Sequence, residues 1–275
     1  MSLIIVSTDG ILPPDSLIEN SFEANDGGWG LVFPNTSTKL HVVKGEQLDS
    51  LLKNIPRAKN LPFMIHMQKG KWVNGKLAAI CDKDIQPHKY CEGGWVAIDD
   101  YVNDVFDMDE TKSNAYNFAA NLYDFYKEYP EYASSADFHG YVERWLGSKV
   151  AGVLIKSVGC EISLLNADLW TEYQGLLLSR KDWTDETIAS KVVPITTASK
   201  STFGCGDKVP LESDSNTPKD GEIIVYSVPH ACDWCTDHET DLYHLEGQEI
   251  CKSCYVFSQS GSMKAFKSND TTFIH

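Results

Sequence analysis

The chain has 275 residues, of which 42% are hydrophobic and 23% charged, as in folded globular proteins rather than disordered chains. The net charge of -15 argues against a broad phosphate-binding surface, because such a surface needs clustered Lys and Arg. The N-terminus lacks the basic region of a signal peptide, and no stretch has the roughly 20 apolar residues of a transmembrane helix. We therefore expect a cytoplasmic protein with one large domain, or one domain plus a small module.

The sequence predicts mainly strands in the first part of the chain. A turn-rich stretch with Gly10 and the Pro13-Pro14 pair follows the first strand, and leucines at helical spacing predict a short helix over 46–55. Apolar runs predict the strands themselves over residues 3–7, 29–33, 38–43 and 62–67.

Two amphipathic helices are expected next. Ser113 can cap the first, and Pro130 closes it, while the second runs from Phe138 to about Gly147. We interpret the aromatic residues of both helices as core rather than as a binding site. Strands are predicted again over 150–158, 161–165 and 174–179. Residues 196–222 are rich in Ser, Thr, Gly, Asp and Pro, which indicates a linker or long loop.

The C-terminal part contains two Cys-x-x-Cys pairs, Cys232 with Cys235 and Cys251 with Cys254, separated by fifteen residues. Two such turns can present four thiolates to one centre, the tetrahedral shell that structural zinc prefers. We therefore predict a zinc ribbon over residues 223–275. Unrelated redox pairs or an iron-sulfur cluster are the alternatives.

A four-thiolate zinc has no open coordination position, so it would stabilise the fold rather than catalyse a reaction. His238 and His244 lie between the pairs and are expected to face solvent. The ribbon is acidic, which favours a protein partner over nucleic acid, although Trp234 and Tyr255 could stack on bases. The scattered cysteines are expected to be buried.

Four stretches occur in the order and rough spacing of the class II glutamine amidotransferase domain, an N-terminal-nucleophile hydrolase. They are EANDGGWGLVF, LHVVKG, LPFMIHMQKG and LWTEYQGLLLSRKDW. The chain most resembles the stand-alone members found in phages, which would place it in the host cytoplasm. The resemblance implies an α+β fold, a four-layer αββα sandwich, over residues 1–195.

The resemblance also assigns the site. The family uses a cysteine after the initiator methionine, with its free α-amine as the general base, and Ser2 stands there in this chain. The wall of the pocket corresponds to Asp26, Gly27, Gly28 and Trp29. The family's His-x-Arg, whose arginine holds the substrate carboxylate, reads His66-Met67-Gln68, with Lys69 as the nearby cation.

The family's Asn-Gly loop, which forms the oxyanion hole, is assigned to Gly93 and Gly94, so that only the Gly94 backbone amide could act. Asp109 is matched to the aspartate that holds the substrate amine. His66 is expected to be structural.

Two hypotheses follow from these substitutions. In the first, glutamine hydrolysis has been lost, and the chain is a zinc-containing protein-binding or regulatory factor. In the second, Ser2 is the nucleophile of a serine-type amidohydrolase or glutamine amidotransferase that acts on an unidentified amide.

Overall fold

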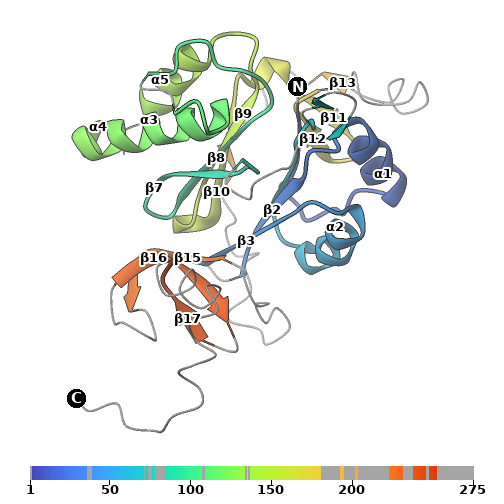
Figure 1. Ribbon diagram of the computed structural model, residues 1–275, viewed down its shortest axis with the longest axis horizontal. Coiled ribbons are helices and arrows are strands. Elements are labelled where there is room, and N and C mark those ends of the chain that lie inside the picture. Colours follow the sequence, from blue (N-terminus) through green and yellow to red (C-terminus); the bar gives the residue numbers. More distant parts are fainter. Residues whose placement is uncertain are drawn as a thin grey trace, which may run out of the picture.

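The fold is a stack of two antiparallel β-sheets between two layers of helices, as the computed structural model in Figure 1 shows. The structure describes residues 2–35, 39–70, 84–106, 109–133, 135, 137–180, 223–231, 238–245 and 248–252, and the short segments 72–73, 76–77, 193–194 and 202–203.

The first sheet has the strand order β13-β11-β12-β1-β4-β2-β3-β15-β16-β17. Every pairing in it is antiparallel, and β1 lies between β12 and β4. Its strands are β1 (Leu3–Ser7), β2 (Trp29–Pro34), β3 (Lys39–Gly45), β4 (Phe63–Met67), β11 (Thr171–Tyr173), β12 (Leu176–Leu178), β13 (Val193–Pro194), β15 (Ile223–Ala231), β16 (His238–Leu245) and β17 (Gln248–Ile250).

The second sheet has the order β14-β10-β9-β8-β7 and is also antiparallel. Its strands are β7 (His88–Cys91), β8 (Gly94–Ile98), β9 (Gly152–Lys156), β10 (Glu161–Leu165) and β14 (Thr202–Phe203). Two short strands, β5 (Trp72–Val73) and β6 (Lys76–Leu77), pair separately.

Helices α1 (Asp15–Ala24) and α2 (Leu48–Asn54) cover the outer face of the first sheet. Helices α3 (Asn114–Glu128), α4 (Pro130–Ala133) and α5 (Asp137–Leu146) cover the outer face of the second. Short 3-10 turns are η1 (Ile55–Ala58), η2 (Val158–Cys160) and η3 (Ala167–Leu169).

Three apolar clusters fill the gaps between these four layers. Leu31 and Ile65 face α1 and α2, whereas Val32 and Met64, their neighbours along the same strands, face the second sheet. This alternation is the period of two that a strand buried on both faces must follow. The predicted αββα order of layers is therefore present.

Several predicted elements are confirmed. The apolar runs near the N-terminus are strands β1 to β4, and α3 begins after Ser113, whose hydroxyl accepts a hydrogen bond from the Tyr116 N–H at 3.1 Å. α5 covers the second predicted helix. Cys91 and Cys160 are buried, as expected for the scattered cysteines that the structure describes.

Other elements differ from the prediction. α1 begins at Asp15, directly after the predicted turn-rich stretch with Gly10 and the Pro13-Pro14 pair, and was not predicted; it has no side-chain N-cap and few buried residues (Leu17, Ile18 and Ser21). β14 lies within the predicted linker and pairs with β10. β15 pairs with β3, so the described strands of the predicted ribbon extend the first sheet. The boundaries at 195 and 222 stay a prediction.

Gly30 of β2 allows the two sheets to close on each other. A Cβ atom at this position would lie 2.0 Å from the backbone oxygen of Gln86. The Gln86 side chain is itself fixed, because its Oε1 accepts from the Ile98 N–H at 2.7 Å and its Nε2 donates to the Ile98 oxygen at 2.9 Å. The Gln86 backbone cannot move away without breaking these hydrogen bonds, and Gly30 cannot move without breaking the pairing of β2 with β3 and β4.

No helix in the described part of the chain is long and apolar enough to cross a membrane.

We predict that Gly30→Ala lowers the free energy of unfolding by about 3 kcal/mol or more, because the added methyl group meets backbone atoms. Chemical denaturation of the purified variant measures this change. Gly140→Ala on α5 is the control, since its Cβ would meet only Arg144 Nη1 at 3.6 Å. It should stabilise the protein by about 0.5 to 1 kcal/mol through helix propensity. Equal effects of the two substitutions would contradict the prediction.

Candidate functional site

Ser2 lies just before β1, at the end of the gap between the sheets. β1 pairs with β4 in a register that sets Leu3 opposite Met67, so Ser2 lies beside Gln68. Alternation along β1 places the Ser2 side chain on the same face as Ile4, toward the second sheet. Its Oγ accepts a hydrogen bond from the Lys69 N–H at 3.5 Å, and the residue is half-buried.

Asp99 reaches Ser2 from the second sheet. It follows the last residue of β8, and its backbone oxygen accepts a hydrogen bond from the Ser2 N–H at 2.6 Å. Its carboxylate Oδ1 accepts from the Ala151 N–H at 2.9 Å, and its own N–H donates to the Ala151 oxygen at 3.0 Å. Asp99 therefore ties the start of β1 to the end of β8.

A third contact comes from the residues after β12. The Ser179 hydroxyl oxygen accepts from the Ile4 N–H at 3.1 Å, and the Ser179 side chain also hydrogen-bonds the Asp99 carboxyl. Burial raises the pKa of Asp99 to about 7, a shift opposed by the positive charge of Arg180 and by hydrogen bonds from Ala151 and Ser179. The carboxyl is therefore partly protonated near neutral pH.

The Asp26–Gly28 turn forms one wall of this site. Asp26 Oδ1 accepts from the Gly70 N–H at 3.2 Å, and the Gly27 N–H donates to the Gln68 oxygen at 2.7 Å. Gly28 has a φ of 97°, a conformation that an L side chain rarely adopts. The structure thus brings Ser2, Gln68 and Lys69 together with the turn.

Trp29, which follows this turn, points to the other side of the sheet. Its indole packs in the cluster under α1 and α2, is fully buried, and donates to the Gln47 oxygen at 2.9 Å. Trp29 therefore supports the wall from behind rather than lining the site.

Gly93 and Gly94, predicted to form the oxyanion hole, do not lie next to Ser2. They lie where β7 turns into β8, and Asp99 follows the opposite end of that strand, about 16 Å away at the usual rise per residue. A Cβ at Gly94 would meet Cys91 Sγ at 2.2 Å, and the Gly93 oxygen accepts from the Ser157 N–H. Both glycines therefore serve the turn and its packing.

Asp109 also has a local role. Its Oδ1 accepts from the Thr111 N–H at 2.9 Å and from the Thr111 hydroxyl at 2.6 Å, and these bonds lower the pKa of the carboxyl. The Asn117 side chain accepts from the Asp109 N–H at 3.1 Å and donates to the Asp109 backbone oxygen at 3.0 Å. The residue is fully exposed and shapes the turn before α3, so its assignment to a substrate amine is not supported by its position.

Two buried histidines lie deeper between the layers. Burial lowers the pKa of His66 to about 3 and holds the pKa of His88 well below its usual value, so both imidazoles are neutral at pH 7. Lys44 adds to both shifts. A histidine that protonates only near pH 3 is a poor general base at neutral pH, which agrees with the structural role expected for His66.

Asp99, Ser179 and Arg180 were not predicted. Asp99 and Asp100 directly follow the apolar run Trp95–Ile98. Two adjacent carboxyls after a buried strand are the sequence signal that could have marked this position. The pattern could not show which distant strand they would meet.

Three of the four predicted zinc ligands lie outside the described residues. Cys251 is described; it directly follows β17 and is 3% exposed. No group of three or more potential metal ligands occurs among the residues that the structure covers. His244, expected to face solvent, is instead buried on β16.

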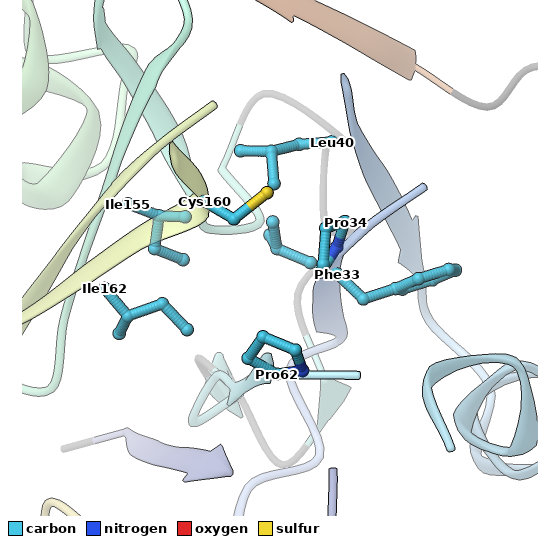
Figure 2. Close-up of a pocket in the computed structure, with 8 residues that line it drawn as sticks. Phe33, Pro34, Leu40, Pro62, Ile155, Cys160 and Ile162 are labelled. Carbon is cyan, nitrogen blue, oxygen red and sulfur yellow. The ribbon is translucent and has the colours of Figure 1, made fainter. Parts of the chain in front are cut away.

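A small hollow of about 190 Å³ opens at the end of the sandwich opposite Ser2. Figure 2 shows that it is lined by apolar side chains from both sheets, with the sulfur of Cys160 directed toward Leu40. It holds no charged group, so polar chemistry belongs to the Ser2 end.

Comparisons with known proteins give the following similarities. No protein-family model matches the chain, and no curated protein matches its sequence. Among solved structures, it is similar to an allosteric regulatory enzyme of purine biosynthesis, with 11% identity and a TM-score of 0.41. It is also similar to glutamine phosphoribosylpyrophosphate amidotransferase from B. subtilis complexed with ADP and GMP, with 10% identity and a TM-score of 0.37. Each match covers 71% of this chain and 44% of the other, so the chain spans less than half of either enzyme.

The buried carboxyl of Asp99 predicts a pH-dependent stability. The folded protein keeps the proton up to about pH 7 and the unfolded chain loses it near pH 4, so stability should fall between these values and then level off. The loss is on the order of 4 kcal/mol. Asp99→Asn keeps the acceptor for Ala151 but cannot ionise, so the variant should lose this slope and be more stable at pH 8.

Denaturant unfolding at several pH values between 4 and 8 measures this difference. Asp100→Asn is the matched control, since Asp100 is adjacent to Asp99 but only half-buried, and it should keep the slope. A slope that persists in Asp99→Asn would contradict the assignment.

Proposed function

We propose that this chain is an amidotransferase-like protein that has lost glutamine hydrolysis and acts as a protein-binding or regulatory factor. The observation that carries the proposal is the contact between Asp99 and Ser2. The Asp99 backbone oxygen accepts from the Ser2 N–H, and the buried carboxyl of the same residue brings an ionisable acid to the Ser2 end of the gap between the sheets.

The charge of this carboxyl opposes amide hydrolysis. Attack of Ser2 Oγ on an amide would put a negative charge on the carbonyl oxygen, and active sites stabilise it with donors that are already in place. Asp99, once ionised, would repel that charge in a partly buried site where electrostatic interactions are strong. Gly94, the donor expected from the sequence, lies at the far end of β8.

Recognition of glutamine is also weakened. Gln68 takes the position at which the family resemblance implies an arginine, and a neutral amide cannot make a bidentate ion pair with a substrate carboxylate. The neighbouring Lys69 is exposed, so its ammonium is a solvated point charge rather than a fixed clamp.

A second candidate is a serine-type amidohydrolase, favoured by Arg180. This half-buried cation lies close enough to Asp99 to lower its pKa, so a positive charge is present at the Ser2 end. In this mechanism Ser2 Oγ would bond to the carbonyl carbon while its free α-amine takes the hydroxyl proton and passes it to the leaving amine. Removal of Met1 is required.

Under the first candidate, the purified full-length protein releases no ammonia from L-glutamine or L-asparagine between pH 5 and 9, above a no-enzyme blank. The same samples are checked by intact mass for Met1. Hydrolysis that disappears in Ser2→Ala, but persists in the control Ser50→Ala on α2, would contradict the first candidate and establish the second.

We further propose that zinc binds Cys232, Cys235, Cys251 and Cys254. The strand register supports this set: Ile250 pairs with Tyr243, so β17 points toward the start of β16, where segment 232–237 joins it. Cys251 begins the second pair and is buried at that point. Four thiolates would make a closed shell, so the metal would hold the C-terminal strands together.

The purified protein should therefore contain about one zinc per chain, measured by elemental mass spectrometry. Cys251→Ser should lower the zinc content and make the C-terminal strands more sensitive to proteolysis, because a ligand is lost. Cys205→Ser is the control and should keep the metal. Iron with acid-labile sulfide, or full zinc content in Cys251→Ser, would overturn the proposed site.

The binding role, the phage origin and the cytoplasmic location stay predictions. A protein partner is favoured over nucleic acid because the net charge of -15 offers little attraction to phosphate.

A further inference from the structure

A row of aromatic rings runs across the outer helical layer of α3 to α5. Ring centroids are 6.0 Å apart between Phe106 and Trp145, 5.9 Å between Trp145 and Tyr141, 4.6 Å between Tyr141 and Phe125, and 5.1 Å between Phe125 and Tyr129. We call these five residues the aromatic row. It joins the loop after β8 to the end of α3.

Phe125, Tyr141 and Trp145 pack, partly buried, against the core under these helices, in line with the core role expected for their aromatic residues, whereas the two ends of the row lie outside the helices. Phe106 is 65% exposed and Tyr129 is 49% exposed, at the two ends of the row. The three rings between them are half-buried. The true core residues of the same helices, Phe118 and Phe138, lie beneath at 0% and 2%. Apolar rings left in water at both ends of a connected row indicate a contact surface.

Acidic residues contact two rings of this row, and others lie on the same elements. Glu128 Oε1 accepts a hydrogen bond from the Tyr129 hydroxyl at 2.8 Å, and Asp104 holds Trp145 through a bond from the indole N–H to its backbone oxygen. Exposed acidic residues on the same elements are Asp104, Asp124, Glu128, Glu131 and Asp137, against the exposed cations Lys127 and Arg144. The surface is therefore both aromatic and negative.

Rings on α3 already accept cations from within the chain. Lys127 Nζ lies 4.2 Å from the centre of the Tyr123 ring, and Lys112 Nζ lies 5.9 Å from that of Tyr116. The same attraction between a cation and a ring face is open to a cation from outside. A guanidinium can stack on a ring and pair with a neighbouring carboxylate at the same time.

We infer that the aromatic row is the docking surface for an Arg- and Lys-rich segment of a partner protein. Charge complementarity selects this occupant: a second copy of the chain would also carry -15, and the two would repel each other. The inference rests on the proposed binding role and locates it on the outer face of α3 to α5, away from Ser2 (Figure 1). Peptide binding and glutamine hydrolysis can therefore fail independently.

The test uses the full chain and a labelled synthetic peptide of alternating Arg and Ser, with fluorescence anisotropy at about 0.15 M salt. The double variant Phe106→Ser, Tyr129→Ser should weaken binding about tenfold, since two ring contacts are lost from exposed positions. Val158→Ser, which removes an apolar side chain that is also 65% exposed, should leave the affinity unchanged. Thermal melts confirm that each variant is folded.

A second pair of variants separates a local surface from net charge. Asp124→Asn with Glu128→Gln should weaken binding, whereas Glu19→Gln with Glu23→Gln, which changes the charge equally on α1, should not. The inference is overturned if the peptide does not bind, if both charge pairs weaken binding equally while the ring variants do not, or if the protein forms a dimer that Phe106→Ser dissociates.

Discussion

The end of the sandwich that holds Ser2 depends on Asp99. Hydrogen bonds within a sheet fix neighbouring strands laterally, but two stacked sheets are otherwise joined by apolar contacts that have no direction. Asp99 adds direction, because its backbone oxygen binds Ser2 and its carboxyl binds Ala151. The hydrogen bond between Asp99 and Ser2 therefore sets the spacing of the sheets at this end. The Asp99 carboxyl also determines the charge near a ligand bound beside Ser2.

The opposite end is closed by shape rather than by charge. There only apolar side chains and Cys160 line the small hollow. Buried apolar groups cannot transfer protons or bind anions. The two ends of the gap therefore differ: Ser2, Gln68 and Asp99 bring polar groups to one end, and apolar side chains line the other.

The strands, the long helices and the four layers could be predicted because each follows from a local pattern, as in β1 or α3. The position of Gly93-Gly94, the predicted oxyanion loop, could not. Gly93-Gly94 matched a pattern of residue types, whereas proximity to Ser2 is set by pairing between distant strands, which brings Asp99 there instead. The repeat of apolar residues along α5 likewise predicts a face turned inward, but does not show that Trp145 stands at the edge of that face.

Under the proposed function, loss of chemistry need not weaken the fold. The backbone of Ser2 bonds Asp99 and the backbone of Gln68 bonds the Asp26–Gly28 turn, contacts that any residue can supply, so other side chains could stand at these two positions. The aromatic row differs, because its rings contact one another while two of them remain largely in water. The exposure of the Phe106 and Tyr129 rings to water is unfavourable, and covering them with a partner would lower the free energy. Under this proposal, the fold no longer catalyses hydrolysis at Ser2 but still binds a partner through its outer helices.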